Sequence, residues 1–189
     1  APGDYWMGTL GGGLNHFRMG QWAKVDRIQG VPALAIMALL KPMDRPGAAA
    51  LVAGVRGIGL ARLDGPNWTW MKENAKLPDD WIYALAETSE SNGPPALWVG
   101  TRKGLVRIQG EQFEVIGVEQ GLPHPHVTAL VENIAPDRRR TLWIGTRGGG
   151  LASMDLATRA CNTHSPATGF PGLRVASLRE CRGPRGERH

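Results

Sequence analysis

The amino-acid sequence predicts an all-β fold, a β-propeller built from four-stranded antiparallel blades. Two motifs recur along the chain with one spacing. The first reads "YWMGTLGGGL", "LVAGVRGIGL", "LWVGTRKGL" and "LWIGTRGGGL", and its first glycines, Gly8, Gly54, Gly100 and Gly145, lie 45 or 46 residues apart. The second carries the prolines Pro32, Pro78, Pro123 and Pro171, which lie 45 to 48 residues apart. Two independent motifs with one period indicate a tandem repeat, and no unit shows the 3.6-residue periodicity of a helical repeat.

The bulk composition fits short strands joined by tight turns. The chain has 189 residues, 26 of them Gly and 14 Pro, and 42% of its residues are hydrophobic. No apolar run reaches the roughly 18 residues that a membrane-spanning helix needs. We therefore expect residues 1–189 to form a single propeller domain or segment, with repeat boundaries near residues 30, 76, 121 and 169.

One repeat unit, residues 121–164, shows how each element is assigned. "GLPHP" is a turn, because Gly and Pro interrupt regular structure. "HVTALVE" (126–132) and "TLWIGT" (141–146) are rich in residues that favour strands, and "LASMD" (151–155) is a third strand after the turn "RGGG". A fourth strand is expected near Cys161, where the earlier units have Trp22, Trp68 and Phe113. Four strands in about 45 residues are typical of a propeller blade.

The glycine cluster in "TRGGGL" suggests a phosphate loop at first sight. A P-loop needs Gly-Lys-Ser/Thr leading into a helix, whereas these glycines lead into a strand. We expect the cluster to supply the positive φ of a tight turn. We also expect Gly145 to let a neighbouring backbone or ring approach, and Trp143 to fill space between sheets.

The repeats are permuted relative to a blade. The chain opens just before the second strand of a blade and closes just after a first strand, which gives four repeats in permuted phase. In a closed ring, the strand around Val175–Leu178 would pair with the strand around Trp6. A four-bladed ring is uncommon, so we expect a segment of a larger propeller or a chain that pairs with repeats of another chain. An open array would expose edge strands.

The text "GLPHPHVTALVE" followed by "TLWIGTRGGGL" resembles the two-component regulator propeller repeat, and the resemblance extends through every unit. The second unit departs most, because "LVAGVRGIGL" lacks the Trp, and the third lacks one loop residue in "GTRKGL". The resemblance implies a non-catalytic ligand-sensing propeller, often for oligosaccharides, in the extracytoplasmic part of a hybrid histidine kinase or diguanylate cyclase. It also implies more blades than this chain supplies and a periplasmic or extracytoplasmic, membrane-anchored sensor.

Two sets of turns are expected on one face, namely the turns before each first strand and those between each second and third strand. Their candidate ligand-binding residues are Asp79, Asp80, Trp81, His124, His126, Arg174, Arg56, Arg102 and Arg147. The arginines at positions 56, 102 and 147 recur, which favours a packing role. The residues that do not recur are the better candidates, because function requires asymmetry whereas the fold requires repetition.

Other functions are less well supported. The net charge of +5 comes from dispersed basic residues, with clusters only at "DRRR" and in the tail "RECRGPRGERH", so nucleic acid is not an expected partner. His124 and His126 have no third metal ligand in phase, and no cofactor is expected. The recurring Glu87, Glu132 and Glu180 are typical of a surface position.

A protein-interaction scaffold remains an alternative function, and a polysaccharide hydrolase or lyase is a more remote one. Whether Cys161 and Cys181 pair stays open. The absence of a leader at Ala1 fits a mature secreted segment or a piece of a longer protein.

Overall fold

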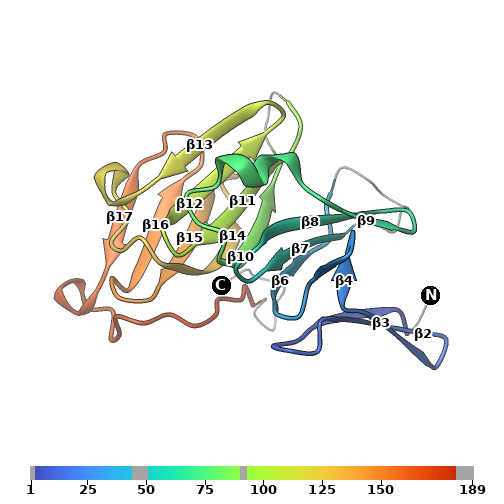
Figure 1. The fold of residues 1–189 in the computed structure, drawn as a ribbon. Coiled ribbons are helices and arrows are strands. Elements are labelled where there is room, and N and C mark those ends of the chain that lie inside the picture. Colours follow the sequence, from blue (N-terminus) through green and yellow to red (C-terminus); the bar gives the residue numbers. More distant parts are fainter. Residues whose placement is uncertain (1–2, 44–50, 90–92, 182–189) are drawn as a thin grey trace. The chain divides into compact units, whose positions relative to one another are not determined.

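A computed structural model of the chain describes residues 3–43, 51–89 and 93–181, and its described secondary structure consists of strands and three short 3₁₀ turns. The chain divides into two compact units, Ala1–Tyr83 and Ala84–His189. Figure 1 labels most of the strands. No helix among the described residues is long and apolar enough to cross a membrane.

The first unit contains a sheet of three strands, a sheet of four and a two-stranded sheet. Its strands are β1 (Tyr5–Gly8), β2 (Leu14–Arg18), β3 (Gln21–Val25), the short pair β4 (Arg27–Ile28) and β5 (Val31–Pro32), then β6 (Ile36–Leu40), β7 (Leu51–Val55), β8 (Gly59–Asp64) and β9 (Asn67–Trp70). The sheet orders are β1-β2-β3 and β6-β7-β8-β9, with antiparallel neighbours, and the 3₁₀ turn η1 (Lys72–Lys76) follows β9. Strand β1 lies at the edge of its sheet, so its first-strand partner is missing from the described residues.

The second unit holds two complete four-stranded blades. The first has the order β10 (Ile82–Thr88), β11 (Ala96–Thr101), β12 (Gly104–Gln109) and β13 (Gln112–Ile116), and β10 begins just before the boundary between the units. The second has the order β14 (Val127–Ile134), β15 (Arg140–Thr146), β16 (Leu151–Asp155) and β17 (Cys161–His164). The 3₁₀ turns η2 (Val118–Gln120) and η3 (Pro166–Thr168) follow β13 and β17. The four strands predicted for residues 121–164 are therefore confirmed.

Each unit has its own apolar core between neighbouring sheets. In the second unit the core joins Trp98, Leu105 and Ile116 of one blade to Leu142, Ile144 and Met154 of the next. Trp98 is fully buried, and its indole N–H donates a hydrogen bond of 2.9 Å to Thr88 Oγ1. The role predicted for the tryptophan of this motif, to fill space between sheets, is confirmed at Trp98, whereas Trp143 is only half-buried. A branched aliphatic core that excludes water supplies most of the driving force for such packing.

The recurring glycine of the first motif makes room for the next blade. A Cβ on Gly54 would lie 2.6 Å from Cγ2 of Ile82, and a Cβ on Gly145 would lie 2.6 Å from Cγ1 of Val175. The same relation joins Gly8 to Ile36. The close neighbour is thus a β-branched side chain at the start of the next first strand, where we had expected a backbone or a ring.

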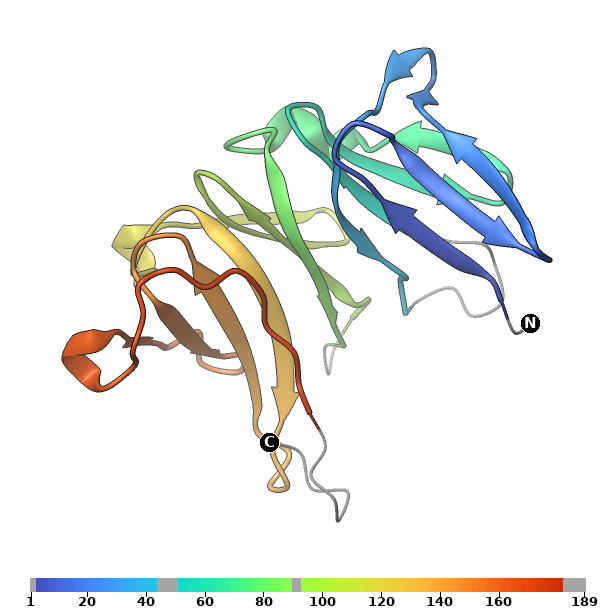
Figure 2. The same ribbon diagram turned by 90° about the horizontal axis from the view of Figure 1, so that it is seen from below.

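Backbone hydrogen bonds join the same pairs of neighbouring segments. Ile36 N donates to Thr9 O at 3.0 Å, and Gly13 N donates to Leu34 O at 2.9 Å. At the other end of the chain, Val175 N donates to Thr146 O and Gly150 N to Leu173 O, both at 2.9 Å. Residues 171–180 are therefore held where a first strand belongs, although they pair with no second strand among the described residues. Figure 2 shows this red segment running beside β14.

Candidate ligand site

Four of the predicted site residues come together in the first unit, on the turns that precede β10 and follow β7. We call Arg56, Asp79, Asp80 and Trp81 the Arg56–Trp81 cluster. The Arg56 guanidinium carbon lies 4.1 Å from the centroid of the Trp81 ring, a close cation–π contact. Gly57 N donates a hydrogen bond of 3.1 Å to Asp80 O, which ties the two turns together. The prediction that these two kinds of turn lie on one face holds for this cluster.

Within the cluster, the two aspartates have different surroundings. Asp79 is buried, with 8% of its surface exposed, and its Oδ1 accepts a hydrogen bond of 2.9 Å from Trp81 N. Asp80 is exposed. The Asp79 carboxylate thus shapes the turn, as aspartates often do two residues before a backbone N–H, and Asp80 presents its carboxylate to solvent.

Trp81 is half-buried, and the side chains of Arg56 and Tyr83 lie close to its ring. The centroid of the Tyr83 ring is 6.3 Å from that of Trp81, and the planes of the two rings form an angle of 35°. Arg56 is exposed, so its guanidinium both covers the indole and keeps donors facing water. The cluster therefore combines an aromatic surface, a hydrogen-bond donor group and a carboxylate, which together suit a polar, hydroxyl-bearing ligand.

The second unit carries four more of the predicted site residues on the corresponding turns. His124 and His126 precede β14, Arg147 follows β15, and Arg174 lies in segment 171–180. Arg147 N donates to His126 O at 2.9 Å, and the backbone contacts of Leu173 and Val175 place Arg174 beside the same turn. Arg147 and Arg174 are exposed, whereas His126 is buried, with 7% of its surface exposed. Arg102, also exposed, lies on the turn between β11 and β12. The part of the chain that the structure describes contains no cluster of three or more His, Cys, Asp or Glu that could hold a metal ion.

His124 has a turn role that its residue type does not reveal. Its Nδ1 accepts a hydrogen bond of 3.1 Å from His126 N, the same i to i+2 contact that Asp79 makes with Trp81 N. Its ring also lies over Gly148, where a Cβ would come within 2.7 Å of His124 Cδ2. Asp79 and His124 hold the same position in their repeats, and each side chain accepts a hydrogen bond from the backbone N–H two residues later.

The glycines of "TRGGGL" have three separate explanations. Gly148 accommodates the His124 ring, Gly149 lies where a Cβ would come within 2.5 Å of Pro123 O, and only Gly150 has a positive φ, of 80°. The expectation of turn chemistry is correct for Gly150, and close approach explains the other two.

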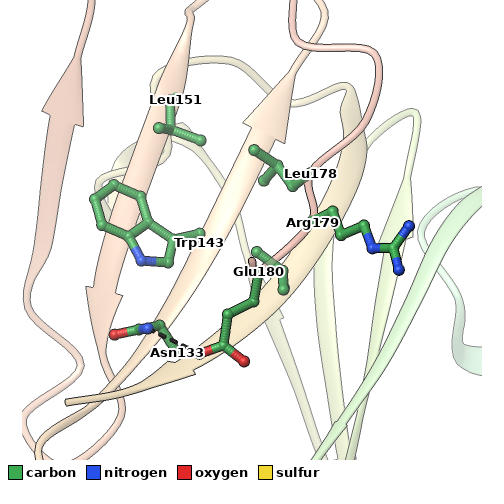
Figure 3. Close-up of a pocket in the computed structure, with 7 residues that line it drawn as sticks. Asn133, Trp143, Leu151, Leu178, Arg179 and Glu180 are labelled. Carbon is green, nitrogen blue, oxygen red and sulfur yellow. Dashed lines mark hydrogen bonds between the residues drawn. The ribbon is translucent and has the colours of Figure 1, made fainter. Parts of the chain in front are cut away.

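Sequence reasoning missed a cavity of about 360 Å³ in the second unit, between the last blade and residues 178–180. Figure 3 shows Trp143 and Leu151 on one side of it and Leu178 and Glu180 on the other. Asn133 Nδ2 donates to Glu180 Oε1 at 3.1 Å across the cavity. Only the packing of a distant segment against the blade creates this space, so no local motif signals it.

The two cysteines, whose pairing the sequence left open, are free thiols. Cys161 lies in β17 and is half-buried, and burial raises the pKa of its thiol. Cys181 is exposed. The last residues of the basic tail, 182–189, lie outside the described part of the chain.

No family model and no curated protein matches the chain. Solved structures do. The extracellular domain of BT3049 from B. thetaiotaomicron, described as a hybrid two-component system, matches 100% of the chain with a TM-score of 0.69 and 18% identity. The extracellular domain of BT4673 from the same organism, described as a one-component system, matches 98% with a TM-score of 0.67 and 14% identity. PorZ of Porphyromonas gingivalis, a surface component of the type-IX secretion system, matches 92% with a TM-score of 0.56 and 15% identity.

At these identities the likeness concerns the fold. It confirms the predicted all-β propeller architecture and, at the level of the fold, the predicted likeness to two-component sensor propellers. The chain spans about a quarter of the length of each neighbour, 24 to 26%.

Proposed function

We propose that this chain is part of an extracytoplasmic sensor propeller, the input module of a membrane-anchored bacterial signalling protein. Its proposed task is to bind a small polar ligand, with oligosaccharides as the leading class, and not to catalyse a reaction. The fold supports this proposal, because the solved extracellular domains of a one-component and a hybrid two-component system share it.

The observation that carries a binding role is the stacked pair of Arg56 and Trp81 on the turns of the first unit. An indole with a guanidinium held over it offers a rigid apolar surface beside several N–H donors, and the exposed Asp80 adds acceptors. Sugars present both apolar C–H faces and hydroxyl groups, so they match this combination.

The same cluster argues against a hydrolase. Asp79 is buried and accepts the Trp81 N–H, so it lacks the exposed position of a second catalytic carboxylate beside Asp80. Acid and base carboxylates of glycosidases lie about 5 to 10 Å apart on opposite sides of the scissile bond.

The test is a binding screen with oligosaccharides and small anions, read by thermal shift and then by titration calorimetry. We expect a ligand to raise the melting temperature and to lose at least tenfold in affinity with Trp81→Ala or Arg56→Ala. Asp80→Asn should weaken binding less, because the amide still accepts one hydrogen bond.

Trp22→Ala is the matched control, because Trp22 is an exposed tryptophan on β3 and outside the cluster. Equal loss of affinity in Trp22→Ala and Trp81→Ala would assign binding to another surface. A complete screen without any stabilising ligand would count against the sensor function.

A further inference from the structure

Tyr83 extends the Arg56–Trp81 cluster along the first strand of its blade. Trp81 immediately precedes β10, and Tyr83 is the second residue of that strand. Side chains two residues apart in an extended chain point to the same side. The centroids of the two rings accordingly lie 6.3 Å apart, and the ring planes form an angle of 35°. Two aromatic rings therefore follow one another at the start of this strand.

This pair of rings occurs in one of the four repeats. The residues that correspond to Trp81 are Ala35, His126 and Arg174, and those that correspond to Tyr83 are Met37, Thr128 and Ala176. The residue between the two positions is instead β-branched in every repeat, as Ile36, Ile82, Val127 and Val175. Each of these four side chains meets the recurring glycine of the preceding blade. The repeat thus requires the middle residue for packing, and it does not require an aromatic residue on either side.

The two rings also lie outside the apolar core of the first unit. Three other aromatic side chains of that unit pack against its core, namely Trp6, Trp68 and Trp70. Within residues 3–43 and 51–83, which the structure describes, the core includes neither Trp81 nor Tyr83. Both rings are half-buried, so each keeps surface that a ligand can contact. Aromatic side chains that are partly accessible and do not stabilise a core are typical of binding sites.

Polar groups lie at the Trp81 end of the pair. The Arg56 guanidinium carbon is 4.1 Å from the centroid of the Trp81 ring, and the exposed Asp80 directly precedes Trp81. The hydroxyl groups of a sugar at Trp81 can therefore accept hydrogen bonds from Arg56 and donate them to Asp80. The next sugar of the same chain can contact Tyr83, because 6.3 Å is comparable with the distance between neighbouring rings of an oligosaccharide.

We propose that Trp81 and Tyr83 contact two consecutive sugar rings of one oligosaccharide, so that the site recognises a disaccharide unit and discriminates against single sugars. This inference rests on the sensor function proposed above, and it adds Tyr83 as a residue that sets the length of the ligand. Tyrosine and tryptophan suit this role because each supplies a large, rigid ring at a low cost in conformational entropy.

The experiment compares the affinities of single sugars and disaccharides for the full-length chain. The probes are three matched pairs, glucose with cellobiose, xylose with xylobiose and mannose with mannobiose, each titrated by calorimetry. We expect a disaccharide of at least one pair to bind about three- to tenfold more tightly than its own monosaccharide, which is the gain from one further aromatic contact.

Tyr83→Met removes the second ring and keeps an apolar side chain that the strand accepts, because Met37 holds the same position in the previous repeat. It should lower the affinity for that disaccharide by about three- to tenfold and change the affinity for the monosaccharide by less than about twofold. Tyr83→Phe keeps the ring and should retain most of the gain. Trp81→Ala, which tests the proposed function, should weaken the binding of both probes.

Tyr5→Met is the matched control. Tyr5 is the other tyrosine of the chain, and it is exposed on β1, outside the cluster. We expect this variant to bind both members of each pair as the wild type does. Circular dichroism checks that all variants keep the wild-type strand content.

Equal affinities for monosaccharide and disaccharide in all three pairs would overturn the inference and leave the sensor proposal standing, because the cluster would then hold a single sugar ring. An equal loss for both lengths in Tyr83→Met would also overturn it, since Tyr83 would then only support the position of Trp81. Unchanged binding in Tyr83→Met would assign the second sugar to another residue. Binding of none of the six probes would overturn the inference together with oligosaccharides as the leading ligand class.

Discussion

Val127 lies so close to Gly100 that a Cβ on the glycine would come within 2.7 Å of the valine Cγ1. The contact joins the second strand of one blade to the first strand of the next. The Cβ of Ala84 also lies close, 3.2 Å from the same position. The glycine is therefore required by close packing of neighbouring sheets, which explains why it recurs in every unit.

Gly100→Ala should destabilise the second unit by about 1 to 3 kcal/mol, because an overpacked core must shift its backbone. Denaturant unfolding measures the change. Gly172→Ala is the control, since nothing lies within 4 Å of a Cβ at Gly172 and its φ is not positive. Gly100→Ala with Val127→Ala should recover part of the loss if the close contact is the cause, and no recovery would point to backbone strain instead.

Thr88 provides the acceptor for the buried indole N–H of Trp98. Thr88→Val keeps the shape but leaves this donor unsatisfied, which should cost about 1 to 3 kcal/mol of stability. Thr88→Ser keeps a hydroxyl and should cost less. Thr163→Val, on an exposed position of β17, should change stability by less than about 0.5 kcal/mol. A Thr88→Val variant as stable as Thr163→Val would show that the indole finds another partner.

Asp79 and Asp80 provide a matched pair of neighbouring carboxylates. Asp79→Ala removes the acceptor of the Trp81 N–H from a buried turn, and we expect a loss of about 1 kcal/mol. Asp80→Ala should leave stability unchanged, because Asp80 is exposed. His124→Asp should preserve the turn at His126, since Asp79 makes the same contact in the previous unit. Thermal unfolding of the three variants checks the order, and a destabilised Asp80→Ala would contradict it.

Asp155 gives the second unit an acid-sensitive turn. Backbone N–H groups of Thr158 and Ala157 donate to its carboxylate and hold its pKa below the ordinary value of 3.8. Because the folded pKa is the lower one, the contribution to stability is present above pH 3.8 and is lost as the pH falls through the folded pKa. The free energy of unfolding, measured between pH 2 and 6, should therefore fall less steeply towards acid pH for Asp155→Asn than for the wild type. The same pH dependence in both proteins would assign the acid sensitivity to other groups.

The two thiols should differ in reactivity. Burial raises the pKa of Cys161, so less of it is thiolate at pH 8, whereas Cys181 is exposed. A limiting amount of a thiol reagent should label Cys181 first, as peptide mass mapping would show. In urea the difference should disappear, and equal labelling of the folded chain would mean that Cys161 is accessible.

The fold could be predicted because its determinants repeat. The glycine that meets Val127 recurs in four repeats and the tryptophan of position 98 in three of them, so the repeats together reveal a packing rule that a single copy would hide. Strand positions followed for the same reason.

The site was less accessible to sequence reasoning. The period of the repeat places the turns of Arg56 and Trp81 on one face. It does not show that the two side chains are in contact, because they belong to different blades. The division of labour between Asp79 and Asp80 depends on burial, which a two-residue motif does not encode. The similarity of His124 to Asp79 was hidden because an imidazole nitrogen and a carboxylate oxygen accept the same backbone hydrogen bond.

The docking of Val175 on Gly145 and Thr146 bears on how the chain is made. Those contacts involve residues of the preceding blade alone, so they require no other strand of the blade that Val175 begins. The ribosome synthesises a chain from its N-terminus. Each completed blade therefore presents backbone hydrogen-bond acceptors to the residues that are synthesised next. The array can then grow in the order of translation, with every new blade templated by the one before it.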